Sequence, residues 1–123
     1  APRVKRLIGI EASPSAADDF SVNLDPFENV ELYEAPAGQA LPALDVKADA
    51  VLVDPPRAGL ERTALEALIR LGAGTLAYIS CDPSTLARDA RRLVDAGYRL
   101  VEVTPFDLFP QTYHLESVAL LRR

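Results

Sequence analysis

The chain has 123 residues, of which 49% are hydrophobic and 25% charged, a composition typical of one globular domain rather than of a disordered segment. Its net charge of -5 differs from the basic charge of most stand-alone nucleic-acid-binding domains. No apolar run reaches the roughly 20 residues of a membrane helix, and a single Cys and a single His exclude an internal disulfide and a Cys-rich zinc site.

The first residues lack the apolar segment of a secretory signal, which favours a cytoplasmic protein. The sequence contains no Met, which indicates a processed or truncated N-terminus.

Short β-like runs alternate with helical patterns along the whole chain. Apolar and β-branched runs predict strands at residues 6–11, 30–33, 50–53, 75–80, 98–103 and 115–121. Apolar residues at helical spacing, with Ser13 and Asp82 as N-caps, predict helices over 13–24, 61–71 and 83–96, and one helical turn near 38–44. This alternation is typical of an α/β fold with a mostly parallel sheet. Residues 105–114 are too irregular for a helical crossover, so the final strand is predicted to run antiparallel to its neighbours.

Ligands of open α/β sheets bind beyond the carboxyl ends of the strands, and this rule selects Glu11, Asp54 and Cys81. The Glu11 carboxylate can accept hydrogen bonds from a ribose, or can simply be exposed beside a helix N-terminus. Asp54 precedes Pro55 and Pro56, which fix a rigid exit from the strand because proline has no N–H to continue the ladder. We interpret Asp54 as a ligand-binding residue rather than as the cap of a plain turn.

Cys81 lies between the fourth predicted strand and the helix that begins at Pro83. The dipole of that helix favours the thiolate, whereas the neighbouring Asp82 carboxylate opposes it. A reactive nucleophile and a buried inert cysteine are therefore both compatible with the sequence.

Residues 106–117 are the most unusual segment of the chain. Phe106 and Phe109 are aromatic residues in a predicted loop, where they either bind a partner or pack onto the sheet. His114 and Glu116 are two positions apart, so on a strand they share one face.

Taken together, four stretches resemble the catalytic domain of the S-adenosylmethionine-dependent RNA uracil-5-methyltransferases, which make 5-methyluridine in tRNA and in 23S rRNA. Residues 8–14 are similar to the strand of that family that holds the cofactor ribose. The family motifs D-P-P-R-x-G, S-C-N-P-x-T-L-x-R-D and D-x-F-P-Q-T-x-H-x-E-x-V match residues 54–59, 80–89 and 107–118, with Asp82 in place of the usual Asn. The resemblance covers essentially the whole chain and implies a Rossmann-like class I methyltransferase sheet.

The resemblance also implies a role for each matched residue. Cys81 would be the nucleophile that adds to uracil C6, and Glu116 the base that removes the C5 proton. Glu11 would bind the ribose of S-adenosylmethionine, and Asp54 would lie by the cofactor and the target base. The base must be unstacked to enter the site, which gives substrate-binding roles to Arg57, Phe106, Phe109, Gln111, Tyr113 and His114. No metal and no membrane are implied, and the RNA partner would be tRNA or 23S rRNA.

The fold of this family opens with a strand, a Gly-rich loop and a helix that cradle the cofactor, and none of the six Gly of the chain forms such a loop. We therefore expect residues 1–123 to be the C-terminal part of a methyltransferase catalytic domain, truncated at its N-terminus and inactive by itself. The missing strand would lie between the strands that end at Glu11 and Asp54. We expect this gap to close by direct pairing of those two strands, or to be filled by another chain through self-association.

Two other functions are compatible with the same residues. Cys81, His114 and Glu116 could be the nucleophile, base and orienting group of a Cys-dependent hydrolase, although His114 and Glu116 would project side by side. The second alternative is a non-catalytic Rossmann-like interaction module, because the charge of Asp82 could weaken the nucleophile.

Overall fold

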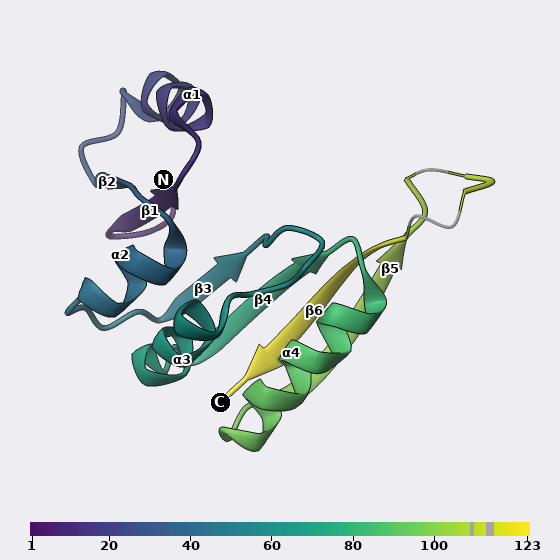
Figure 1. The fold of residues 1–123 in the computed structure, drawn as a ribbon. Helices are drawn as coiled ribbons and strands as arrows, with labels where there is room; N and C mark the ends of the chain where they lie inside the picture. The colour runs from purple at the N-terminus through teal and green to yellow at the C-terminus, as the bar shows by residue number, and fades with distance from the viewer. Residues whose placement is uncertain (109, 113–114) are drawn as a thin grey trace. The chain divides into compact units, whose positions relative to one another are not determined.

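The computed structural model describes residues 1–108, 110–112 and 115–123 (Figure 1). Phe109, Tyr113 and His114, three of the predicted substrate-binding residues, lie outside the described residues. The chain divides into two compact units, Ala1–Leu44 and Asp45–Arg123, which are described separately.

The first unit contains two parallel strands and two helices. They are β1 (Leu7–Glu11), α1 (Pro14–Leu24), β2 (Val30–Glu34) and α2 (Ala37–Ala43). Gly9 of β1 is needed for the packing of α1, because a Cβ at this position would come within 2.6 Å of the Phe20 ring. Ser13 occupies the N-cap position of α1 as predicted, but its side chain makes no capping hydrogen bond.

The second unit is a four-stranded mixed sheet with two long helices. Its elements are β3 (Ala50–Val53), α3 (Arg62–Leu71), β4 (Thr75–Ser80), α4 (Pro83–Asp95), β5 (Arg99–Phe106) and β6 (Glu116–Arg122). The strand order is β3-β4-β6-β5, with β3 parallel to β4 and β6 antiparallel to both of its neighbours. The predicted antiparallel direction of the final strand is therefore confirmed.

The core of this unit lies on one face of the sheet. Buried and half-buried residues alternate along β4 and β6, as they do when only one face of a sheet is covered by helices. The buried residues of both strands pack with Leu65 of α3 and with Leu86 and Leu93 of α4. The opposite face is open in this unit, and Leu52 of β3 is 68% exposed there.

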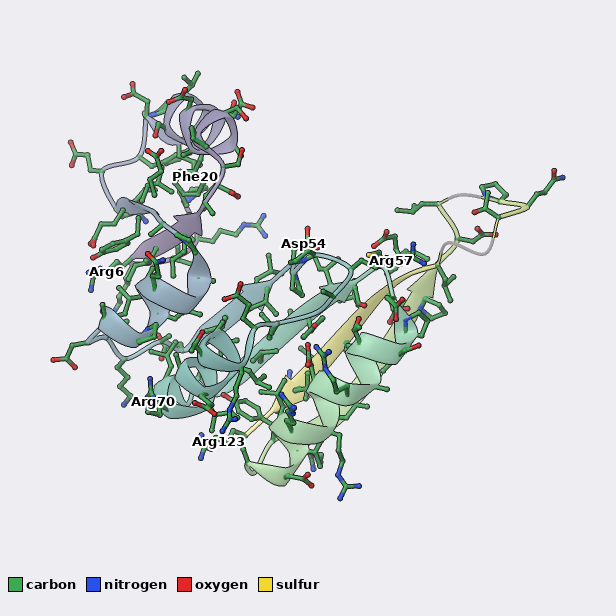
Figure 2. All side chains as sticks on the ribbon, in the orientation of Figure 1. Arg6, Phe20, Asp54, Arg57, Arg70 and Arg123 are labelled. Atoms are coloured by element: carbon green, nitrogen blue, oxygen red, sulfur yellow. The ribbon has the colours of Figure 1, made fainter. Side chains whose placement is uncertain are left out.

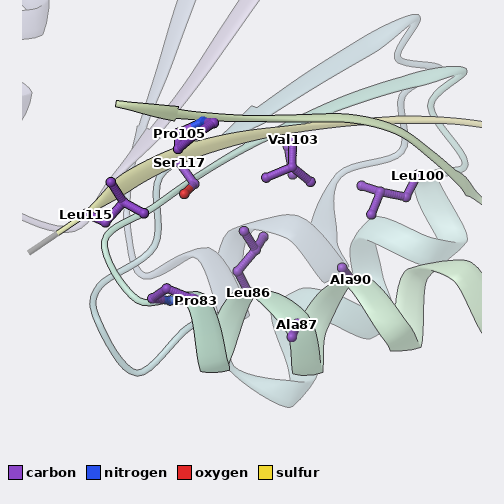
Figure 3. Close-up of a pocket in the computed structure, with 10 residues that line it drawn as sticks. Pro83, Leu86, Ala87, Ala90, Leu100, Val103, Pro105, Leu115 and Ser117 are labelled. Atoms are coloured by element: carbon purple, nitrogen blue, oxygen red, sulfur yellow. The ribbon is translucent and has the colours of Figure 1, made fainter. Parts of the chain in front are cut away.

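The outer part of the helix-covered face is less tightly filled. An apolar groove runs between α4 and the strands β5 and β6 (Figure 3). Val103, Pro105 and Ser117 line this groove opposite Leu86, so all three belong to the face that α4 covers.

Two expectations from the sequence are wrong. The fifth strand was predicted to end at Val103, but β5 continues through Pro105 to Phe106, so Phe106 ends a strand and does not belong to a loop. Proline is tolerated there because β5 is an edge strand, where a missing N–H breaks no ladder. The direct pairing expected between the strands ending at Glu11 and Asp54 is also absent, because β1 and β3 belong to separate sheets.

The asymmetry of the sheet predicts different effects of two Leu→Ala changes in its strands. Leu121→Ala removes a side chain that is 0% exposed and should lower the free energy of unfolding by about 2–5 kcal/mol. Leu52→Ala, on the open face, should change it by less than about 0.5 kcal/mol. Urea unfolding of both variants tests the assignment, and equal losses would contradict it.

Candidate active site

The register of β6 with its two neighbours brings three of the predicted site residues together. Ser80, the last residue of β4, is the partner of Ser117, and Phe106, the last residue of β5, is the partner of Glu116. Cys81 follows Ser80 directly, so continuing the register by one position sets Cys81 beside Glu116. The predicted nucleophile, the predicted base and an aromatic residue therefore form one row across three adjacent strand ends.

This row faces the open side of the sheet. Ser80 and Ser117 are 4% and 6% exposed and belong to the helix-covered face. Because side chains alternate between faces, Glu116 and Phe106 project to the opposite face. Cys81 and Glu116 are half-buried, and Phe106 is 45% exposed. Glu116 and Phe106 are therefore accessible from the open face, next to the strand end that Cys81 follows.

The junction between β4 and α4 fixes the position of Cys81. The Ser80 hydroxyl donates to the Asp82 carbonyl at 2.8 Å, and the Asp82 N–H donates to Ser80 Oγ at 3.1 Å. The Asp82 side chain accepts hydrogen bonds from the N–H groups of Ser84 and Thr85, at 2.9 and 3.1 Å. Asp82 is therefore the N-cap that the sequence predicts. Cys81 lies between Ser80 and Asp82, which are both held by these hydrogen bonds.

The negative charge of Asp82, next to the thiol, is partly compensated. The hydrogen bond from the Thr85 N–H, with further contributions from the Ser84 N–H and Arg57, holds the pKa of Asp82 below its ordinary value. Arg57 Nε lies 3.5 Å from Asp82 Oδ2. The carboxylate that replaces the usual Asn at position 82 is thus compensated by two backbone N–H groups and one arginine.

Asp54 and Arg57 lie at the same edge of the sheet, in the segment that follows β3 (Figure 2). Asp54 is exposed, and the Arg57 side chain is 61% exposed although it pairs with Asp82. Both side chains are therefore accessible to a ligand at the carboxyl ends of β3 and β4.

The other predicted residues fall in different places. Glu11 ends β1 in the first unit, and its Oε1 accepts a hydrogen bond of 2.7 Å from the Ser13 N–H. Gln111 is exposed in the segment between β5 and β6, with a φ of 66°, in the left-handed region. Within the described part of the chain, no three His, Cys, Asp or Glu side chains come close enough to hold a metal ion. No described helix is long and apolar enough to cross a membrane.

Asp89, for which the sequence predicted no role, is buried on the core-facing side of α4 and contacts the segment after β3. The sequence signal for a structural role of Asp89 is its position among the apolar residues Leu86, Ala90 and Leu93, because a buried charge requires specific partners.

The fold has known counterparts among solved structures. The chain is similar to the N-methyltransferase NodS of Bradyrhizobium japonicum, whose crystal structure is a complex with S-adenosyl-L-homocysteine. The identity is 18% and the TM-score 0.74, over 100% of this chain and 69% of that chain. The fold is therefore that of the α/β methyltransferases. The predicted fold class is confirmed.

A narrower assignment comes from the family comparison. The family model of the tRNA (uracil-5-)-methyltransferases matches residues 37–123, and the chain belongs to this family. It is similar to the Pyrococcus abyssi tRNA (uracil-54, C5)-methyltransferase, whose crystal structure holds S-adenosyl-L-homocysteine, with 35% identity and a TM-score of 0.81. That match covers 98% of this chain and 30% of that chain.

Curated relatives agree with this assignment. An uncharacterized RNA methyltransferase of Caldanaerobacter subterraneus subsp. tengcongensis is 43% identical over 128 residues, which cover 100% of this chain and 28% of the relative. An uncharacterized RNA methyltransferase of Thermotoga maritima is 40% identical over 116 residues, with coverage of 94% and 27%. The chain therefore spans less than a third of the length of these relatives.

The lowered pKa of Asp82 predicts a pH-dependent contribution of the helix cap. Its stabilising effect should be present above the ordinary Asp pKa of 3.8 and should disappear as the pH falls through the lower value of the folded chain. At pH 7 Asp82→Ala should lower the thermal unfolding midpoint, and the difference from the unmodified chain should shrink on acidification. Asp82→Asn, an uncharged cap, is the matched control and should lose little. A pH-independent effect of Asp82→Ala would contradict this assignment.

Proposed function

We propose that the chain carries the reacting residues of an S-adenosylmethionine-dependent methyltransferase that forms 5-methyluridine in tRNA or rRNA. The observation that supports this most directly is the register that sets Cys81 beside Glu116 on the open face of the sheet. Membership of the tRNA (uracil-5-)-methyltransferase family gives this pair its chemical context.

In the proposed reaction the Cys81 thiolate adds to C6 of the target uracil, and the electron pair of the C5–C6 double bond moves to C5 and O4. This activation is needed because uracil C5 is a weak nucleophile by itself. Bound S-adenosylmethionine supplies the methyl group that C5 takes up. Glu116 then accepts the C5 proton, the double bond re-forms, and the Cys81 thiolate leaves C6. Glu116 next to Cys81 is well placed because addition and proton removal occur on adjacent carbons.

Two residues are proposed to hold the cofactor. Glu11 ends β1, and its hydrogen bond with the Ser13 N–H orients the carboxylate while leaving acceptor capacity for the hydroxyls of a ribose. Asp54 is exposed at the end of β3, where the two prolines after it restrict the backbone. Carboxylates at strand ends suit the hydroxyl and amino groups of S-adenosylmethionine.

The remaining predicted residues are proposed to bind the RNA. Phe106, beside Glu116 in the register, offers an aromatic surface for a base that has left its stack. The Arg57 side chain is 61% exposed, and guanidinium N–H groups that do not face Asp82 can contact a phosphate. Gln111, with Phe109, Tyr113 and His114 from outside the described residues, is proposed to complete the binding of the target nucleotide.

The chain is further proposed to be the C-terminal part of a methyltransferase catalytic domain in a longer cytoplasmic protein, in keeping with its coverage of 28% of the Caldanaerobacter relative. The strands pair into two separate sheets, β1-β2 and β3-β4-β6-β5, within one chain. This pairing gives no support to self-association of the chain.

The 123-residue chain alone should bind S-adenosylmethionine weakly and turn over no RNA, because none of its six Gly forms a Gly-rich cofactor loop. Isothermal titration with S-adenosylmethionine and incorporation of a labelled methyl group into tRNA and 23S rRNA test this. Turnover by the isolated chain would refute it.

The roles of Cys81 and Glu116 can be separated in a protein that contains the whole catalytic domain. Cys81→Ala should abolish both methylation and the covalent complex with 5-fluorouridine RNA. Glu116→Gln should slow methylation by roughly 100-fold or more, the scale of a lost general base, while a covalent complex with unmodified RNA accumulates. Glu102→Gln changes an exposed carboxyl group of β5 and is the control.

The same experiment discriminates the alternative functions. A protein that forms no covalent RNA complex but hydrolyses thioesters in a Cys81-dependent manner would be the hydrolase. A protein with neither activity would be the interaction module. Membership of the tRNA (uracil-5-)-methyltransferase family supports the methyltransferase over both alternatives.

A further inference from the structure

A buried carboxylate links α4 to the segment that follows β3. Asp89, in the middle of α4, is 0% exposed. Its Oδ2 accepts hydrogen bonds from the Leu60 N–H at 2.8 Å and the Tyr78 hydroxyl at 2.7 Å, and its Oδ1 accepts one from Arg88 Nε at 2.9 Å. A buried charge is tolerated only with such a full set of partners, and one of them is a backbone group after β3.

The backbone of residues 57–60, which we call the β3–α3 loop, is fastened to α4 at three points. Thr85 Oγ1 donates to the Arg57 carbonyl at 3.0 Å, and Arg88 donates to the Ala58 carbonyl at 2.9 Å. Asp89 accepts from the Leu60 N–H, as described above. Three residues within little more than one turn of α4 therefore define the path of this loop.

The close approach of loop and helix explains Gly59. Its φ is +80°, in the left-handed region, and a Cβ there would come within 2.5 Å of both Arg88 and Asp89. The loop cannot keep this path with any side chain at position 59.

The helix that fastens the loop also carries the proposed nucleophile at its start. Thr85 Oγ1 lies 3.3 Å from the Asp82 carbonyl oxygen as well as 3.0 Å from that of Arg57, so it joins the residue after Cys81 to the loop. The Arg57 side chain reaches back to Asp82 at 3.5 Å. Displacement of the loop would therefore remove the positive charge beside Asp82.

We propose that Asp89, with Thr85 and Arg88, is a positioning residue that holds the β3–α3 loop so that Arg57 stays beside Asp82, the residue that follows Cys81. The effect of this positioning on catalysis rests on the proposed function. The position of the loop and the reactivity of the Cys81 thiol can be measured without it. The three residues touch neither the reacting base nor the cofactor in this proposal.

The test compares Asp89→Asn with Tyr78→Phe in the full chain. Asp89→Asn removes the charge of the buried carboxylate that accepts from the Leu60 N–H, whereas Tyr78→Phe removes one hydroxyl donor and leaves that carboxylate in place. Amide hydrogen exchange at Leu60 should be faster in Asp89→Asn by roughly tenfold or more, relative to Tyr78→Phe compared at equal global stability. Equal exchange in the two variants would overturn the proposal.

A second pair remains informative if Asp89→Asn does not fold. Thr85→Val removes the hydroxyl that joins loop and helix, and Thr85→Ser retains it. Because Cys81 is the only cysteine, its alkylation by iodoacetamide reports on the site without any RNA. Thr85→Val should slow alkylation about two- to fivefold, the scale of an exposed ion pair, and Thr85→Ser should not. Equal rates would contradict a positioning role.

Failure of the positioning role can be distinguished from failure of the proposed function. If a protein with the whole catalytic domain methylates no RNA, the exchange and alkylation measurements still decide whether the loop is positioned by α4. If it does methylate RNA, Thr85→Val should lower kcat with little change in the KM for RNA, and Thr85→Ser should restore it. Methylation that is insensitive to Thr85→Val would overturn the positioning role alone.

Discussion

The pairing of β6 between β4 and β5 is the constraint on which the second unit depends. Side chains alternate along a strand, so a slip by one residue would turn Glu116 toward α4 and Ser117 toward the open face. Ala119 and Leu121 are both 0% exposed. The slip would expose these two apolar side chains to water and is therefore unfavourable. The buried apolar residues of β6 thus fix which of its side chains face the open side of the sheet.

The helix α4 serves packing and chemistry with different parts of its surface. Leu86 and Leu93 anchor it to the sheet, Asp82 caps its start beside Cys81, and Asp89 ties it to the loop after β3. Burial by itself would raise the pKa of Asp89, but hydrogen bonds from Arg88, Leu60 and Tyr78 outweigh burial and leave the pKa below its ordinary value. The charge is therefore retained inside the unit, where a neutral acid would bind the Leu60 N–H and the arginine less strongly.

Much of the fold follows from local patterns, and the parts that do not are those that depend on distant partners. The helix starting at Pro83 and the antiparallel last strand could be predicted, because capping residues and loop length are visible in the sequence. The continuation of β5 through Pro105 could not, since only its place at the sheet edge makes proline acceptable. Of the proposed site, Cys81, Glu116 and Asp54 could be selected from motifs and strand ends. The partnership of Asp89 with Leu60 was not, because spacing along a helix does not reveal a backbone donor that precedes it by a whole strand and helix.

The outer edge of β5 has a consequence for how this unit can meet other polypeptides. The register shift between Leu100 and Glu102 interrupts its hydrogen-bonding row, and Pro105 offers no N–H near its end. Exposed strand edges are templates for aggregation, and bulges and prolines are the features that prevent a further strand from adding there. Although Val101 and Val103 are 45% and 44% exposed, this side of the sheet is thereby protected against fibril-like growth.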